Sequence, residues 1–88
     1  MGFFMPFFVY VLYSAAADRY YIGQTHDLSD RISRHNAGSE KATSPFIPFT
    51  LVWYTEKSSR SDAISLERKL KNLSRLRLKL FIEKYNQR

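Results

Sequence analysis

Aromatic and β-branched residues cluster in three short segments of the chain, as is typical of β-strands. These segments are residues 7–13, 20–24 and 49–55. Small and turn-prone residues at 14–19 separate the first two segments, which predicts an antiparallel hairpin. The polar segment 39–48 carries two prolines and predicts a loop before the third strand.

Helical spacing and capping residues predict three helices in the rest of the chain. Asp27 is a favourable N-cap and Gly38 a favourable stop, so the first helix is expected over residues 28–37. The sequence Ser-Arg-Ser-Asp at 59–62 opens a second helix, whose apolar residues continue to Leu70. Residues 74–85 alternate leucine with basic residues, but Leu, Lys and Arg are strong helix formers, which favours a third helix. The predicted fold is α+β, a three-stranded antiparallel sheet flanked by three helices in the order β-β-α-β-α-α.

The composition predicts one small domain without covalent crosslinks. The 88 residues, of which 44% are hydrophobic, suffice for a single core, so residues 1–88 are expected to form one domain. The absence of cysteine excludes disulfides and thiolate metal sites, and it is compatible with a cytoplasmic location. No Lys or Arg precedes the apolar N-terminal run, and Pro6 interrupts it, so it predicts a core strand and no membrane span.

Positive charge is concentrated in the C-terminal part of the chain. The formal net charge is +6, and because basic and acidic residues balance over residues 1–59, the whole excess lies in residues 60–88. Such a basic surface attracts polyanions, so nucleic acid is the expected partner. A solvated surface that only aids solubility is the open alternative. Arg68 and Lys71 are the candidate substrate-binding residues of this segment.

Two polar residues of the first predicted helix lie on its apolar face. At about 100° per residue, Arg31 and His35 project from the same side as Leu28 and Ile32. A guanidinium turned toward a sheet is unfavourable unless it is paired or lines a cleft. Arg31 and His35 are therefore candidate site residues. The structural alternative is an arginine at the rim and a hydrogen-bonded core histidine.

The second predicted helix places one acidic residue among its apolar positions. Glu67 lies between Ala63 and Ile64 on the helical wheel, in a segment that is otherwise basic. A carboxylate in this position is a candidate ligand for Mg²⁺, which takes one or two carboxylates and keeps several waters. The alternative is a salt bridge to Arg31 or to a neighbouring basic residue.

The order and spacing of these residues resemble the GIY-YIG nucleases. Val9-Tyr10 and Tyr21-Ile22-Gly23 are similar to the two tyrosine motifs of that family. Arg31, His35 and Glu67 follow in the order and approximate spacing of the family. The resemblance spans residues 8–80 and is greatest to short stand-alone bacterial members of the YhbQ/UPF0213-like kind.

This resemblance implies an endonuclease that depends on Mg²⁺ or Mn²⁺. Glu67 would ligate the metal, and Arg31 would contact the scissile phosphate. Tyr10 and Tyr21 would orient or deprotonate the attacking water. His35 would assist through a hydrogen bond to a tyrosine or to the phosphate. Because a tyrosine titrates near a pH of about 10, it needs help to act as a base, and which tyrosine does so stays open.

Secondary candidates follow from the resemblance and from the loop. Gly23 would let the chain pass close to a phosphate, with a plain turn glycine as the alternative. Lys41, Thr43 and Ser44 have groups that donate to a phosphate, although a flexible polar loop is the simpler expectation.

Three features depart from the family pattern. Phe8 stands at the usual glycine of the first motif, so any need for tight backbone there is relaxed or lost. Gln24 follows the second motif where some relatives carry lysine. The late asparagine of the family has no secure counterpart. Since Arg31 and Glu67 are both present, a competent active site is expected.

The sequence supports two functions of different classes. The first is a metal-dependent endonuclease acting on DNA, with specificity from substrate shape or from a protein partner, because no element for reading bases is evident. The second is a non-catalytic nucleic-acid-binding module that uses the basic C-terminal helices. An RNA-processing enzyme with the same chemistry is not separable from the first.

Overall fold

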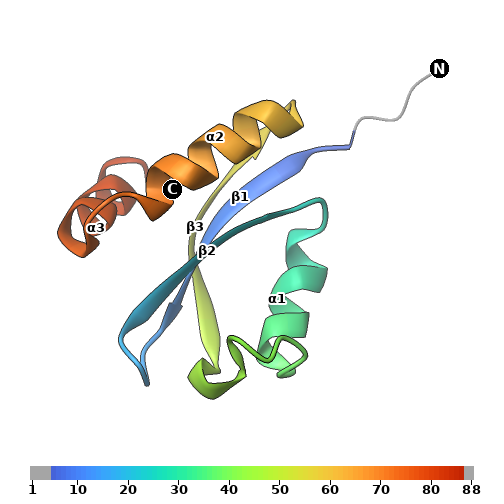
Figure 1. Ribbon diagram of the computed structural model, residues 1–88, viewed down its shortest axis with the longest axis vertical. Coiled ribbons are helices and arrows are strands. Elements are labelled where there is room, and N and C mark those ends of the chain that lie inside the picture. The colour runs from blue at the N-terminus through green and yellow to red at the C-terminus, as the bar shows by residue number, and fades with distance from the viewer. Residues whose placement is uncertain (1–4, 87–88) are drawn as a thin grey trace.

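The central element of the computed structural model, which describes residues 5–86, is strand β1 (Phe7–Ser14) (Figure 1). Strands β2 (Arg19–Thr25) and β3 (Phe49–Lys57) pair with it on either side, and both are antiparallel to it. The sheet order is β2-β1-β3, so β2 is an edge strand. The predicted α+β fold and its order of elements are confirmed.

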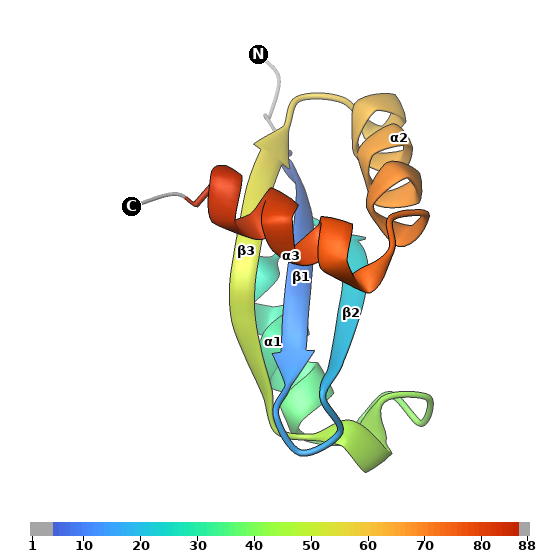
Figure 2. The same ribbon diagram turned by 90° about the vertical axis from the view of Figure 1, so that its left-hand side faces the viewer.

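The helices cover opposite faces of this sheet. Helix α1 (Leu28–Asn36) lies on one face, whereas α2 (Arg60–Lys71) and α3 (Arg75–Lys84) lie on the other, as Figures 1 and 2 show. The three N-caps are side chains that accept a hydrogen bond from a backbone N–H in the first turn, and they are Asp27, Ser59 and Ser74.

Most element ends differ from the sequence expectation by one or two residues. Helix α1 ends at Asn36, because the chain turns at Gly38, whose φ of 78° suits glycine. Strand β3 continues two residues past the expected Thr55, to Lys57. The predicted loop contains a short 3₁₀ helix, η1 (Ser44–Phe46), which begins beside Pro45.

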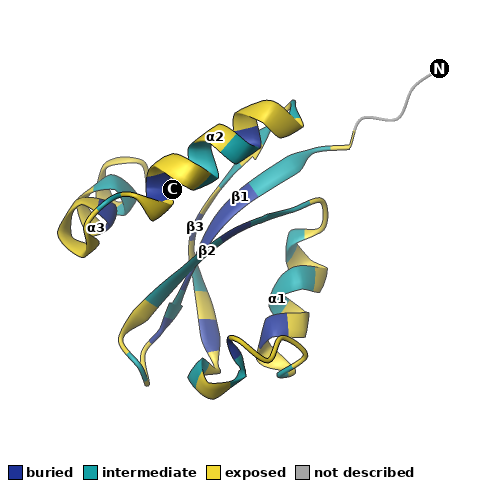
Figure 3. Ribbon diagram, viewed as in Figure 1, coloured by how far each residue is buried: buried dark blue, intermediate teal, exposed yellow. Residues whose placement is uncertain are grey.

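Alternate residues of β1 supply two separate cores. Val9 and Val11 face α2 and α3, where they pack with Trp53, Leu70 and other apolar residues. Tyr10 and Leu12 face α1 and pack with Phe49 and with partly buried apolar residues. Figure 3 shows buried segments along β1, with exposed residues on the outer surfaces of the helices. The strand is buried on both faces, which explains its continuous apolar character.

The predicted single domain over residues 1–88 includes residues 1–4 and 87–88, which lie outside the described residues. No helix within residues 5–86 has the length and apolar content that crossing a bilayer requires.

Candidate active site

The two motif tyrosines lie on neighbouring strands and face the side of the sheet that α1 covers. Tyr10 on β1 is directly opposite Gly23 on β2. A Cβ atom at residue 23 would lie 2.5 Å from the Tyr10 hydroxyl oxygen and 2.7 Å from its ring carbon Cζ. Gly23 is therefore needed because the Tyr10 ring lies directly over it. This packing requirement replaces the simple turn glycine that the sequence left open.

His35 joins Tyr10 to the loop that follows α1. Its Nδ1 lies 3.1 Å from the Thr43 hydroxyl, and its Nε2 lies 3.3 Å from the Tyr10 hydroxyl. The Thr43 hydroxyl donates to the Glu40 carbonyl, so it accepts from Nδ1–H. In this tautomer Nε2 accepts a hydrogen bond from Tyr10. Since His35 is fully buried, burial lowers the pKa of its imidazole and favours the neutral form.

Tyr21, Arg31 and Glu67 all lie close enough to the Tyr10 hydroxyl to affect its pKa. Burial, aided by the nearby phenol of Tyr21 and carboxylate of Glu67, raises the pKa of Tyr10 to about 12. The charge of Arg31 and its hydrogen bond to the phenol lower the pKa and only partly offset this rise. Tyr10 is therefore a neutral phenol at physiological pH, and it donates to His35.

Arg31 lines a cleft of about 440 Å³ at the point where β2 ends and α1 begins. Gln24 and Thr25 form the strand side of this cleft, and Arg60 enters from the first turn of α2. Within residues 5–86, no carboxylate forms an ion pair with Arg31. The arginine is partly exposed, and it faces a space that an anion can enter.

Glu67 contacts the side chain of Gln24, which also lines the cleft at Arg31. Its Oε1 accepts a hydrogen bond from the Gln24 amide at 2.7 Å, and its Oε2 lies 2.9 Å from the Lys71 ammonium. The expected alternative of a salt bridge is thus realised with Lys71, one helical turn away, and not with Arg31. Arg68 lines the same small pocket as Glu67 and Lys71, so both basic candidates of α2 lie beside the carboxylate.

The surroundings of Glu67 fit a metal that takes one protein carboxylate. Residues 5–86 contain no group of three or more His, Asp or Glu side chains that could enclose an ion. Mg²⁺ commonly keeps several waters and shares its remaining ligands between one or two carboxylates and substrate phosphates. The side chain of Lys71 is 55% exposed, so it is able to leave Oε2 when a cation arrives.

Six predicted site residues converge around the second half of β2, and of the loop candidates Thr43 contacts this group whereas Lys41 does not. The converging residues are Tyr10, Tyr21, Gly23, Arg31, His35 and Glu67. Within this group the Tyr21 ring lies 4.9 Å from that of His35 and is partly exposed. Lys41 is exposed and is not among the residues that line the clefts at Arg31, Tyr21 and Glu67. Thr43 is buried against His35, so its hydroxyl serves the imidazole.

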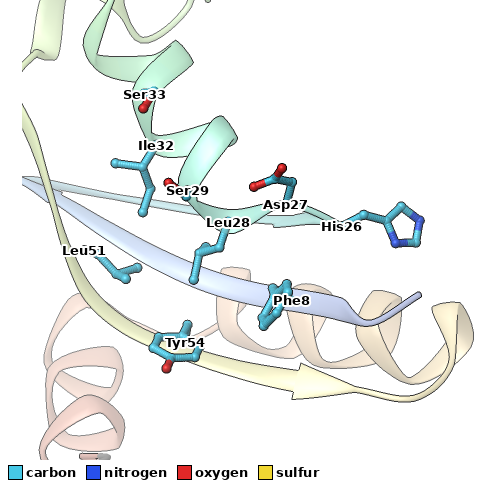
Figure 4. Close-up of a pocket in the computed structure, with 9 residues that line it drawn as sticks. All are labelled: Phe8, His26, Asp27, Leu28, Ser29, Ile32, Ser33, Leu51 and Tyr54. Atoms are coloured by element: carbon cyan, nitrogen blue, oxygen red, sulfur yellow. The ribbon is translucent and has the colours of Figure 1, made fainter. Parts of the chain in front are cut away.

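An apolar groove lies apart from these groups. It has a volume of about 680 Å³ and lies between α1 and β3, lined by residues such as Leu28, Ile32, Leu51 and Tyr54 (Figure 4). Phe8, which replaces the motif glycine, is on this groove with its ring 6.2 Å from that of Tyr54. The bulky residue therefore occupies space beside β3 and leaves the cleft at Arg31 open.

Two residues of the site are not among the site residues that the sequence predicts. Gln24 was noted only as a departure, yet its amide links the cleft at Arg31 to Glu67. A signal existed, because Gln24 shares its strand face with Ile22 and so faces α2. Arg60 had no signal, since it is one of nine basic residues in the segment 60–88.

Comparison with known proteins identifies the family and the fold. The model of the GIY-YIG catalytic domain matches residues 6–86. A UPF0213 protein of Lacticaseibacillus paracasei is 33% identical over 78 residues, covering 88% of this chain and 86% of its own. The solution NMR structure of a UPF0213 protein from Bacillus halodurans superposes with a TM-score of 0.61 at 30% identity, covering 92% of this chain and 86% of that one.

GIY-YIG domains form a nuclease superfamily whose members act on nucleic acid and are generally dependent on a divalent metal. The family match extends over nearly all of the described residues, and the two UPF0213 proteins share the sequence and the fold. The chain therefore belongs to the GIY-YIG nuclease superfamily, as its two tyrosine motifs predicted.

Proposed function

We propose that this chain is a divalent-metal-dependent endonuclease that hydrolyses phosphodiester bonds in DNA. The observation that carries the proposal is the convergence of Arg31, Tyr21 and Glu67 around the second half of β2, against a buried Tyr10–His35 pair. Phosphodiester hydrolysis requires charge neutralisation on the phosphate, an aligned water and stabilisation of the leaving oxygen. These three groups supply the side chains for that chemistry.

Arg31 contacts the scissile phosphate, and the buried network behind it holds its guanidinium. Tyr10 donates to His35, and His35 donates to Thr43, while Arg31 lies close enough to the phenol to lower its pKa. Both donors in this chain have a defined acceptor, so the phenol beside the guanidinium has a fixed direction before substrate arrives. Tyr10 and His35 act as positioning residues, because both are fully buried and neither reaches the substrate.

Tyr21 is the phenol that meets the attacking water. It is partly exposed, whereas Tyr10 is buried and its pKa is raised to about 12. Glu67 would hold the divalent cation, which would neutralise the developing charge on the phosphate. The Gln24 amide orients the Glu67 carboxylate by occupying Oε1 and leaving Oε2 to Lys71 or to a ligand that replaces it.

Substrate choice rests on shape or on a protein partner. The basic residues near the site are suited to phosphates, and phosphate contacts carry no base information. A branched or flap structure, or a partner that delivers the DNA, would supply the selection, and the cytoplasm is the proposed compartment. The experiment therefore offers flap, fork, nicked and single-stranded DNA, and RNA, each with and without Mg²⁺ or Mn²⁺.

The decisive variants are Arg31→Ala and Glu67→Ala. Removing one group that stabilises transition-state charge lowers the turnover rate by about 10²–10³-fold, so both variants should lose metal-dependent cleavage. Arg34→Ala on the same helix and Glu83→Ala on α3 remove the same charges from exposed positions and should cut normally.

Two outcomes would contradict the proposal. Equal cleavage by the wild type and by both active-site variants would indicate a contaminant. Binding of DNA without cleavage of any substrate would favour the non-catalytic binding module. Preferential cleavage of RNA would support phosphodiester hydrolysis and show that DNA is the wrong substrate.

A further inference from the structure

The cleft at Arg31 contains a second guanidinium from a distant part of the chain. Arg31 belongs to α1 and Arg60 to the first turn of α2, helices that cover opposite faces of the sheet. Both side chains line the same cleft of about 440 Å³, together with Gln24 at the end of β2. The cleft lies where β1 begins and β2 ends, so the two side chains approach each other at this end of the sheet.

Neither arginine is neutralised within residues 5–86. The ion pairs of this part of the chain join Arg34 to Asp30, Lys71 to Glu67 and Arg75 to Asp18. Asp27 is the acidic residue that lines the cleft, and its carboxylate already accepts a hydrogen bond from the backbone of Asp30 as the cap of α1. Two like charges that face one cleft repel each other unless an anion lies between them.

We propose that Arg60 binds a second phosphate of the substrate strand, next to the phosphate that Arg31 contacts. This inference rests on the proposed function, because it takes the strand that Arg31 holds as its ligand. A nucleic-acid strand carries one negative charge per nucleotide, so a cleft with two unpaired arginines matches two successive phosphates. Arg60 thereby holds the strand beside the reactive phosphate, in the cleft that Gln24 also lines.

The test compares Arg60→Gln with Lys69→Gln. Both substitutions remove one positive charge from an exposed position of α2, so their long-range effects are matched. Binding to a fluorescein-labelled flap oligonucleotide is followed by fluorescence anisotropy in EDTA at several salt concentrations. Loss of a charge-assisted phosphate contact should weaken binding by Arg60→Gln about tenfold. The slope of log affinity against log salt should become shallower by about 0.7–0.9.

Lys69→Gln should change affinity less than about twofold and leave the slope as it is in the wild type. Equal losses in the two variants would overturn the proposal, since only net charge would then matter. Circular dichroism melting of both variants checks that the fold is retained. In cleavage assays with Mg²⁺, Arg60→Gln should raise KM and leave kcat nearly unchanged.

The two proposals can fail separately. If the wild type cuts DNA and Arg31→Ala does not, while Arg60→Gln binds like the wild type, the role of Arg60 is wrong and the nuclease stands. If no substrate is cut but Arg60→Gln alone shows the weaker, flatter binding, the nuclease is wrong and the phosphate contact stands. If the wild type binds no nucleic acid, both are wrong.

Discussion

The face of the sheet that α1 covers buries hydroxyl and imidazole groups, whereas the face that α2 and α3 cover buries hydrocarbon. On the α1 side, Tyr10, His35 and Thr43 are buried and are linked by hydrogen bonds. On the opposite side, Val11 and Leu70 belong to an apolar cluster. The same strand supplies both faces, because successive residues of β1 point in opposite directions.

The two faces differ in how they contribute to stability and to chemistry, although α2 also supplies Glu67. Burial of apolar surface contributes about 25 cal/mol per Å², while an intramolecular hydrogen bond contributes only about 1 kcal/mol net. The α2/α3 side contains the larger apolar cluster and therefore gains more from burial of apolar surface. The α1 side contributes less free energy and instead fixes the directions of donors and acceptors, which is what a site for phosphate requires.

The largest effect is expected from a cavity on the hydrocarbon side. Leu70→Ala should lower the free energy of unfolding by about 2–5 kcal/mol, because Leu70 is fully buried and little can collapse into the space. Urea denaturation measures this loss. At low temperature, cleavage per folded molecule should stay close to the wild-type rate. A selective loss of cleavage would show that the two faces are not separable.

The next largest effect is expected at the contact between β1 and β2 on the polar side. Gly23→Ala should lower the free energy of unfolding by about 1–3 kcal/mol and remove cleavage, since its Cβ displaces the Tyr10 ring and so disturbs Arg31. Gly38→Ala is the matched control, because its strain comes from φ and the nearest atom to its Cβ lies 3.9 Å away. It should lose stability and keep cleavage. Equal losses of cleavage would contradict the account of Gly23.

The buried imidazole makes the polar side sensitive to acid. The folded pKa of His35 lies below its unfolded value of about 6.5, so the unfolded chain binds more protons between these two values. Stability is therefore complete above about pH 6.5 and falls as the pH decreases toward the folded pKa. Thermal melting from pH 7.5 to 5 should show this fall. In His35→Gln the fall should be smaller, and an unchanged profile would assign it to other groups.

The smallest effect is expected at the ion pair beside Glu67. Lys71→Met should change the free energy of unfolding by only about 0.3–0.5 kcal/mol, as for other helical ion pairs one turn apart, because the Lys71 side chain is 55% exposed. Because Lys71 no longer competes for Oε2, Mn²⁺ should bind about twofold more tightly by calorimetry. Lys69→Met controls for the lost charge. Weaker Mn²⁺ binding to Lys71→Met would show that the lysine does not compete with the cation.

The fold was predictable because local and global signals agree in most elements. The caps Asp27 and Ser59 mark the helix starts, and the β-branched residues of β1 suit a strand buried on both faces. The leucines of α3 alternate as in a strand, yet helix propensity decided the outcome there. The exact end of β3 was missed, because pairing with β1 extends it over the polar residues Glu56 and Lys57.

The site was only partly predictable, since its polar contacts depend on tertiary packing. The helical wheel placed Arg31 and His35 correctly on the inward face of α1. The buried role of Thr43 was not foreseen, because a loop residue eight positions after His35 carries no periodic signal. Likewise, the link from Gln24 to Glu67 spans 43 positions and forms only when α2 lies over β2.

The interlocked pair Tyr10 and Gly23 also limits how this protein can diverge. The phenol ring fills the space of the missing side chain, so any lineage that gains a methyl group at position 23 must replace the ring at position 10 as well. The two positions should therefore be inherited together. A descendant that changes only one of these two residues would keep the apolar core between the sheet and helices α2 and α3. The orientation of Arg31 would be lost.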